Sequence, residues 1–335
     1  MLMYVKWGTA AMDANNVKRI EWIDVAKGIT ILCMIAGHCF SFGSIERNLI
    51  FSFHMPIFFI FTGFTMRNVV NVRDFFRGLK KDFFRLIVPA VVIQSINLFF
   101  SIFVAGGALK PEIIVFIKQL FWASAVDIYG NPALGALWFL FAMFWAKQIY
   151  HFVNVFLNSK YSFIVYFMLA VCGKIISSHY WLPQSFDIAL VAVLFIWTGN
   201  IIRQYWDIIE KNLLVITTCA FALWMFWWQT GVYIELGTRS YPQFIVCIVE
   251  AIMGSICIFI LGKALEANKL ISKYFSMIGK ETLIILGVHH LDMWASFFWN
   301  RGAVWEVILW RTIFDLVIAA GIVLLYRRIK LVFIQ

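Results

Sequence analysis

Residues 241–263 read YPQFIVCIVEAIMGSICIFILGK, and the only charged side chains in this run are those of Glu250 and Lys263. A helix of about 20 apolar residues is long enough to cross the hydrocarbon core of a bilayer. Apolar runs of similar length recur along the chain, so we predict an all-α, polytopic integral membrane bundle of about ten transmembrane helices. The predicted spans are 24–43, 48–67, 84–105, 134–157, 161–178, 186–203, 212–230, 241–263, 279–298 and 305–326.

The composition supports the same fold class. Hydrophobic residues make up 62% of the chain, charged residues make up 14%, and the mean hydropathy is +0.84. A soluble domain carries roughly 25% charged residues. We therefore interpret residues 21–335 as one transmembrane domain and residues 1–20 as a short cytoplasmic leader. The leader is polar and lacks the apolar run of a secretory signal.

The positive charges predict the orientation of the bundle. With ten spans and a cytoplasmic N-terminus, 21 of the 28 Lys and Arg residues fall on the cytoplasmic side. This asymmetry follows the positive-inside rule and predicts that both termini are cytoplasmic. Residues 112–125 are short and weakly apolar, and we interpret them as a re-entrant or interfacial helix. If they spanned the membrane instead, every later orientation would invert.

The net charge of +10 does not call for a nucleic-acid partner, because basic loops beside a bilayer face anionic lipid head groups. The six cysteines are scattered through apolar runs without the spacing of metal ligands, so they read as small hydrophobic side chains. We therefore expect membrane lipids as partners and no metal centre.

Ionisable side chains at bilayer depth cost about 2.5–3.5 kcal/mol each on insertion scales, so each one is a candidate for function. In the first span, Lys27 and His38 are eleven residues apart. At about 100° and 1.5 Å per residue, both lie on one helix face, about 16 Å apart. This pair predicts the wall of a polar channel, and a snorkelling lysine with a core histidine is the alternative. Gly28 and Gly37 would allow a neighbouring helix or a ligand to approach closely.

The second predicted span opens with His54 and Pro56. A short loop joins it to the first span, so the two helices are antiparallel neighbours and His54 is expected close to His38 on the outer half. Pro56 is tolerated at a helix start or beside a cavity. Two nearby histidines also fit a metal site, but the spacing offers no third ligand.

A basic segment follows the second span. Residues 67–85 contain six cations and two acids. The positive-inside rule alone would explain them. The sharper hypothesis is a cytoplasmic docking surface that binds the phosphates of a polyanionic cofactor.

Further polar residues lie inside the later apolar runs. Glu250 is near the middle of its span and could orient a histidine or balance a cation, and His289 lies in the span 279–298. Asp187 is interpreted as a helix N-cap. Asp292 and Asp315 are interpreted as structural.

Several motifs occur in order between residue 22 and about residue 290. They are Trp22-Ile-Asp24-Val-Ala-Lys27-Gly28 with Gly37-His38, Phe53-His54-Met-Pro56-Ile-Phe-Phe59 with Thr62-Gly63-Phe64, Lys81-Asp-Phe-Phe-Arg85-Leu-Ile-Val-Pro89, Leu137-Trp138-Phe139-Leu140, and Gly279-Lys280-Glu281-Thr282 leading to His289. In these motifs the chain resembles the membrane acyltransferase-3 family, within it the branch of fucose 4-O-acetylase-like and bacterial polysaccharide O-acetyltransferases. The family usually has Arg where this chain has Lys27, and lysine lacks the bidentate guanidinium fork.

The resemblance implies an O-acetyltransferase of the bacterial plasma (inner) membrane. It would move an acetyl group from cytoplasmic acetyl-CoA to a hydroxyl of a cell-surface polysaccharide or lipid-linked glycan. His38 would be the general base and His54 would polarise or orient, by direct transfer or through an acetyl-histidine. CoA phosphate would be bound by Lys27, Arg77, Lys81 and Arg85, and the further site candidates are Asp24, Glu250 and His289.

Two other function classes remain open at this point. A multi-pass transporter or flippase could use the intramembrane histidines and Glu250 as a proton relay, although the chain shows no internal repeat of the kind common in secondary transporters. A non-catalytic partner in a glycan assembly complex is the second. The identity of the acceptor glycan and the size of the acyl group are not readable from the sequence.

Overall fold

The computed structural model describes residues 19–69, 71–157 and 162–333. The predicted leader therefore lies outside the described residues, apart from its last two. Within the described part the protein is helical, with two isolated β-bridges and no strand. The all-α prediction is confirmed.

The described residues form more helices than the ten predicted spans. In chain order they are α1 (Glu21–Gly37), α2 (Ile45–Phe51), α3 (Pro56–Thr65), α4 (Val72–Asp82), the π-helical turn η1 (Phe83–Ile87), α5 (Val88–Phe103), α6 (Leu109–Trp122), η2 (Gly135–Leu137), α7 (Trp138–Phe156), α8 (Ser162–Ser177), η4 (Pro183–Ser185), α9 (Phe186–Gln204), α10 (Trp206–Lys211), α11 (Leu213–Trp228), α12 (Phe244–Glu266), α13 (Lys269–Lys280), α14 (Thr282–Leu291), η5 (Asp292–Ala295), α15 (Ser296–Trp299) and α16 (Val304–Phe333). Each predicted span overlaps at least one of them.

Five helical stretches of the described chain are both long and apolar enough to cross a membrane. They are Ile45–Thr65, Val72–Phe103, Pro183–Gln204, Phe244–Glu266 and Val304–Ile329. The helices α8 and α11 are apolar but shorter. The count of about ten spans and the orientation of the termini therefore stay predictions.

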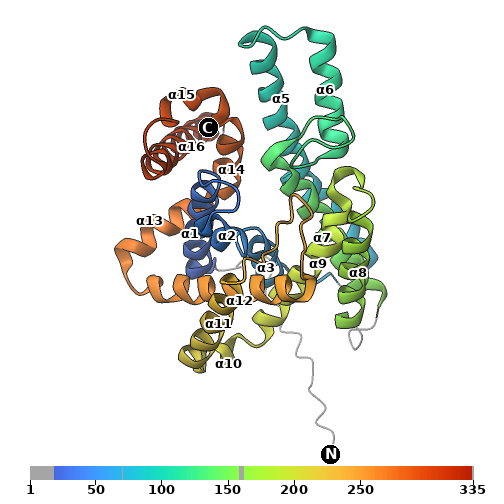
Figure 1. Ribbon diagram of the computed structural model, residues 1–335, viewed down its shortest axis with the longest axis vertical. Coiled ribbons are helices and arrows are strands. Elements are labelled where there is room, and N and C mark those ends of the chain that lie inside the picture. The colour runs from blue at the N-terminus through green and yellow to red at the C-terminus, as the bar shows by residue number, and fades with distance from the viewer. Residues whose placement is uncertain (1–18, 70, 158–161, 334–335) are drawn as a thin grey trace, which may run out of the picture.

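The segment α1–α3 lies in the centre of the molecule (Figure 1). Helix α1 packs against α12 and α13, and α3 packs against α9. Glycines make these contacts close, because a methyl group at Gly28 would overlap the Phe275 carbonyl and one at Gly63 would overlap the Ile196 carbonyl. Gly37 lies against the side chains of Ile50 and Phe51. The predicted close approach of a neighbour at Gly28 and Gly37 is confirmed.

The peripheral helices differ from this centre. In the most apolar window of Pro183–Gln204, 83% of the residues are buried, whereas the corresponding value is 11% for both Val72–Phe103 and Val304–Ile329. Apolar residues left exposed on a long helix suit contact with lipid tails. We therefore place α9 in the protein core and assign the outer faces of α5 and α16 to the bilayer.

The second predicted span, 48–67, overlaps the stretch Ile45–Thr65, which is long enough to cross a membrane, but the α-helical winding is interrupted within it. Helix α2 ends at Phe51 and α3 begins at Pro56. Proline has no N–H to donate, and its ring conflicts with the carbonyl four residues earlier, so it starts a helix more readily than it continues one. His54 lies in the resulting break.

The predicted span 279–298 is broken as well. Helix α13 ends before Glu281, and α14 gives way to 3₁₀ winding at Asp292. Both acids form ion pairs with α16, Glu281 with Arg327 at 3.7 Å and Asp292 with Arg311 at 2.6 Å. The two ion pairs therefore link both ends of α14 to α16.

The helices α5 and α6 form a hairpin that projects from the body of the molecule (Figure 1). Helix α6 has 14 residues, which at about 1.5 Å per residue is shorter than the bilayer core. The interpretation of residues 112–125 as re-entrant or interfacial stays a prediction. At the opposite end of α5, the buried Asp82 forms an ion pair with Lys147 of α7.

Candidate active site

Three cavities adjoin the face of α1 that carries Lys27 and His38. The Lys27 cavity has a volume of about 200 Å³, the central chamber about 360 Å³ and the Arg47 cavity about 240 Å³. The Lys27 cavity is lined mainly by apolar side chains, with Lys27, Thr62, Thr65 and Thr282 as its polar ones. The central chamber holds the polar side chains of His38, His289, His290 and Arg311. The Arg47 cavity holds those of His38, Arg47, His54, Glu235 and Thr238.

The three cavities share walls. Met34 and Leu286 line both the Lys27 cavity and the central chamber, and Met55 lines all three. His38 lines both the central chamber and the Arg47 cavity. The α1 spacing thus puts Lys27 and His38 on one face, as the helical period predicts.

His38 is the residue that directly follows α1, and its ring lies close to those of two other histidines. Its ring centroid lies 5.3 Å from that of His289 and 6.4 Å from that of His54. Its side chain is exposed towards the two cavities. In the described part of the chain, neither ring nitrogen of His38 has a hydrogen-bond partner, so both are free to meet a substrate.

His54 is held by the break between α2 and α3. Its Nδ1–H donates to the Ile50 carbonyl at 3.1 Å, because a carbonyl can only accept. The ring also lies against Phe51, with 4.3 Å between centroids. Nε2 of His54 is therefore left with a lone pair and can accept a hydrogen bond.

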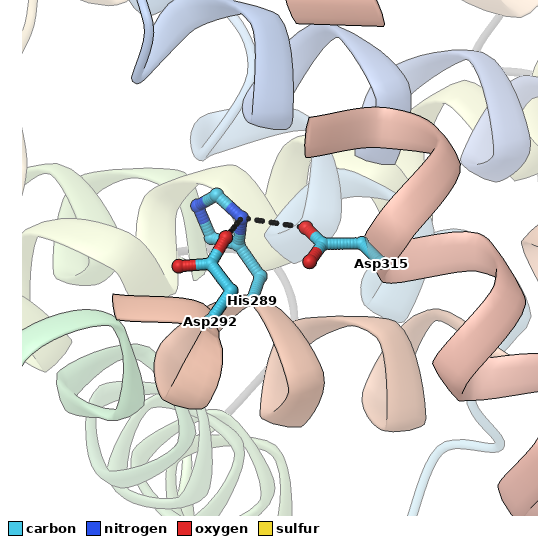
Figure 2. Close-up of side chains that lie close together, drawn as sticks. All are labelled: His289, Asp292 and Asp315. Atoms are coloured by element: carbon cyan, nitrogen blue, oxygen red, sulfur yellow. Dashed lines mark hydrogen bonds and ion pairs between the residues drawn. The ribbon is translucent and has the colours of Figure 1, made fainter. Parts of the chain in front are cut away.

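His289 sits in a buried cluster of charges, drawn in Figure 2. Its Nδ1 lies 2.9 Å from Oδ2 of Asp315 and 3.4 Å from Oδ2 of Asp292. Asp292 also takes a forked contact from the Arg311 guanidinium, at 2.6 Å to Nε and 2.9 Å to Nη2. Residues three or four apart share a helix face, which explains how α14–η5 presents His289 with Asp292 while α16 presents Arg311 with Asp315.

The spacing of this cluster also resembles that of a metal site. One ligand atom each from His289, Asp292 and Asp315 can be chosen within 4.8 Å of one another. However, Arg311 already occupies both oxygens of Asp292, and Asp315 contacts the imidazole directly. A divalent cation would have to displace these contacts, so we interpret the cluster as an ion-pair network.

His290 lines the same chamber and is hydrogen-bonded to a chain of side-chain amides. Its Nε2 lies 3.0 Å from the side-chain oxygen of Gln94, and the side-chain NH2 of Gln94 donates to the side-chain oxygen of Gln119 at 2.6 Å. Gln119 in turn donates to the Ala133 carbonyl at 2.8 Å. This chain ties the α5–α6 hairpin to the site.

The loop between α11 and α12 closes the other side of the site. Arg47 donates to Glu235 at 2.9 Å and lies over the ring of Phe51 at 3.6 Å. In the same loop, the fully buried Arg239 pairs with Asp187 at 2.9 Å and stacks on Trp181 at 3.9 Å. These two arginines fix the loop that supplies Glu235 and Thr238 to the Arg47 cavity.

Comparison with known protein families matches residues 20–327 to the acyltransferase domain. The chain belongs to the membrane acyltransferase-3 family. Comparison of this acyltransferase with curated proteins and with solved structures gives no match. An acyl-transferring enzyme is thereby supported, and the transporter reading is not favoured.

The remaining sequence candidates lie outside the three cavities of the acyltransferase. Asp24 is buried and pairs with Arg19 at 2.6 Å. Glu250 is fully buried, and neither of its carboxylate oxygens has a hydrogen-bond partner among the described residues. The structure therefore shows Glu250 orienting none of the described histidines.

The basic side chains expected to bind a cofactor lie on the α4–η1 segment. Arg77, Lys81 and Arg85 are exposed and line none of the cavities, and Arg77 pairs with Asp74 at 3.1 Å. Leu86, which follows Arg85, lines the Lys27 cavity. The basic segment therefore ends, in the sequence, next to one lining residue of that cavity.

Three sequence interpretations change at this site. Asp187 is no N-cap, because its carboxylate pairs with Arg239, a residue of the α11–α12 loop. Asp292 and Asp315, interpreted as structural, contact a histidine that lines the chamber. A signal for Asp315 was present in the sequence, because Arg311 and Asp315 are two opposite charges four residues apart inside an apolar run.

Proposed function

We propose that this acyltransferase moves an acetyl group from cytoplasmic acetyl-CoA to a hydroxyl of an extracytoplasmic glycan in a bacterial plasma membrane. One observation carries the proposal: His38 lines both the central chamber and the Arg47 cavity, and the central chamber shares the lining residues Met34, Met55 and Leu286 with the Lys27 cavity. A donor and an acceptor could therefore meet at one imidazole while entering from different sides.

The Lys27 cavity suits the donor. Its mainly apolar walls and threonine hydroxyls fit a pantetheine arm, and the rise from Lys27 to His38 is about 16 Å. Lys27, with Arg77, Lys81 and Arg85 on the nearby basic segment, would bind CoA phosphates through charge-assisted hydrogen bonds.

The Arg47 cavity suits the acceptor. Arg47, Glu235 and Thr238 offer hydrogen-bond donors and acceptors for sugar hydroxyls, and Trp138 and Phe51 offer apolar surfaces. His54, whose Nε2 can only accept in this tautomer, would orient the attacking hydroxyl.

His38 would act as the general base. As the acceptor oxygen forms a bond to the thioester carbonyl carbon, the hydroxyl proton passes to the imidazole. The carbon–sulfur bond then breaks, and the proton is returned to the departing CoA thiolate. The products are an acetyl ester and free CoA.

The test is acetyl transfer in inside-out membrane vesicles, with labelled acetyl-CoA supplied to the exposed cytoplasmic face. Label is followed into the surface glycan fraction of the host. Loss of a general base typically costs about 10²–10⁴-fold in rate, so His38→Ala should reduce labelling to the background of a deletion strain. The matched control is His179→Ala, which removes an exposed histidine that lines none of the cavities. Equal labelling from wild type and His38→Ala would contradict the assignment.

A further inference from the structure

The buried cluster of His289, Asp292, Arg311 and Asp315 has a charge balance that depends on one proton. Two carboxylates face one guanidinium, so a neutral imidazole would leave a net charge of −1 in a buried site. Asp292 and Asp315 are 2% and 0% exposed. An uncompensated buried charge is strongly unfavourable, so the cluster favours a protonated His289, which makes its net charge zero.

Each carboxylate of the cluster has its own main partner: Asp292 pairs with Arg311, and Asp315 pairs with His289. Arg311 binds both oxygens of Asp292. Asp315 forms no ion pair with Arg311, and among the described residues its one hydrogen bond is the 2.9 Å contact from Nδ1 of His289. Its other oxygen is buried without a partner. Asp315 is thus the counter-ion that a proton on His289 requires.

The direction of this contact decides what His289 offers to a substrate. With Nδ1–H donated to Asp315, the proton that charges the ring is carried by Nε2. His289 lines the central chamber, 5.3 Å from His38 between ring centroids. The chamber therefore receives a charged N–H donor next to a histidine that has no carboxylate partner in the described chain.

The other histidines of the site differ from His289 in this respect. His54 donates to the Ile50 carbonyl and His290 to the Gln94 side chain, and both partners are neutral. Neither contact stabilises an imidazolium as a carboxylate does. A positive charge on His289 also disfavours a second one on His38, which keeps His38 neutral and able to accept a proton.

We propose that His289 is a second catalytic residue, whose Nε2–H binds the thioester carbonyl oxygen and stabilises the negative charge that develops there. Asp315 is its positioning residue, which fixes the ring tautomer and its charge. His38 takes the hydroxyl proton, the carbon–oxygen bond forms and the carbon–sulfur bond breaks, while His289 keeps its own proton. This inference rests on the proposed acetyl transfer.

The test uses three variants in the vesicle assay, with kcat and KM measured for acetyl-CoA. Removal of one donor to a developing oxyanion costs about 10²–10³ in kcat, so His289→Ala should lose that much. His289→Gln should recover at least tenfold over His289→Ala, because a glutamine amide can donate a hydrogen bond but cannot act as a base. Asp315→Asn should lower kcat at least tenfold with an unchanged KM. His179→Ala is again the control.

The outcomes separate the two proposals. If wild-type vesicles transfer no label from acetyl-CoA, the proposed function and this inference both fall. If the wild type is active and His289→Ala retains its kcat, the inference alone is wrong. Equal kcat values for His289→Gln and His289→Ala would show that His289 does not act as a donor. If His289→Ala does not elute as a folded species in detergent, His289→Gln and Asp315→Asn still decide the question through their kcat values.

Discussion

The two ends of the row of adjoining cavities are built differently. The Lys27 cavity has one cation among apolar and hydroxyl side chains, and no carboxylate is among its lining residues. The His38 end is surrounded by paired charges, which are Arg47–Glu235, Arg311–Asp292 and His289–Asp315. Groups that must meet a transition state are best held in place before the substrate arrives. The Lys27 end instead leaves its cation for a ligand to neutralise.

The same contrast holds for the segments that frame each end. The α11–α12 loop beside the Arg47 cavity is fixed by Arg239 and Asp187, whose side chains are 1% and 0% exposed. The basic segment beside the Lys27 cavity carries Arg77 and Asp74, whose side chains are 71% and 41% exposed. Both pairs join arginine to aspartate at nearly equal distances, 2.9 and 3.1 Å. Burial is therefore the variable that separates them.

The largest expected effect follows from the comparison of the buried Arg239–Asp187 pair with the exposed Arg77–Asp74 pair. Breaking a buried ion pair costs about 3–5 kcal/mol, because the remaining charge is left unpaired, so Arg239→Ala should lower the free energy of unfolding by that amount. Arg77→Ala is the matched control and should cost about 0–1 kcal/mol, because its pair is solvated. Unfolding in detergent measures both. Similar losses for the two variants would contradict the contrast between the ends.

Much of the fold could be predicted from the sequence. The bilayer thickness sets the length of an apolar run, and the α-helix sets the spacing of residues on one face. The apolar runs located the helices, and the spacing of Lys27 and His38 placed both on one face. The breaks at Pro56 and Glu281 were not predicted as interruptions, because an apolar run of sufficient length reads as one span. Where such a run is interrupted depends on tertiary contacts, such as the pair between Glu281 and Arg327.

The candidate site was predicted only in part. The proximity of His38 and His54 followed from a short loop between neighbouring helices. Arg311 lies inside the predicted span 305–326, and the structure pairs it with Asp292 inside the protein. A charge count assigns a residue to a side of the membrane but not to a partner. The contact between α14 and α16 that joins Asp315 to His289 spans 26 residues, and no local pattern encodes it.

A smaller effect is expected at the Lys27 end. Lys27 is half-buried, with Nζ 5.8 Å from the centroid of the Phe61 ring. A partly solvated charge pair contributes about 0.5–1 kcal/mol, so Lys27→Ala should raise the KM for acetyl-CoA about two- to fivefold and leave kcat unchanged. Lys27→Arg restores the charge and adds a fork for phosphate, so its KM should be no higher than that of the wild type. A fall in kcat instead would place Lys27 in the chemical step.

The smallest expected effect is that of metal removal, and it tests the same cluster that distinguishes the His38 end. His289, Asp292 and Asp315 have the spacing of a metal-binding trio. Their charges are nevertheless balanced by Arg311 and by the proton on His289, so a divalent cation would add two positive charges to a neutral buried cluster. Incubation of the vesicles with EDTA should therefore leave the rate of acetyl transfer unchanged. The cluster would instead be a metal centre if EDTA lowered the rate, if added Zn²⁺ restored it in the wild type, and if Zn²⁺ failed to restore it in Asp315→Asn. In that case the His289 imidazole would be a ligand, and its role as a charged donor would be wrong.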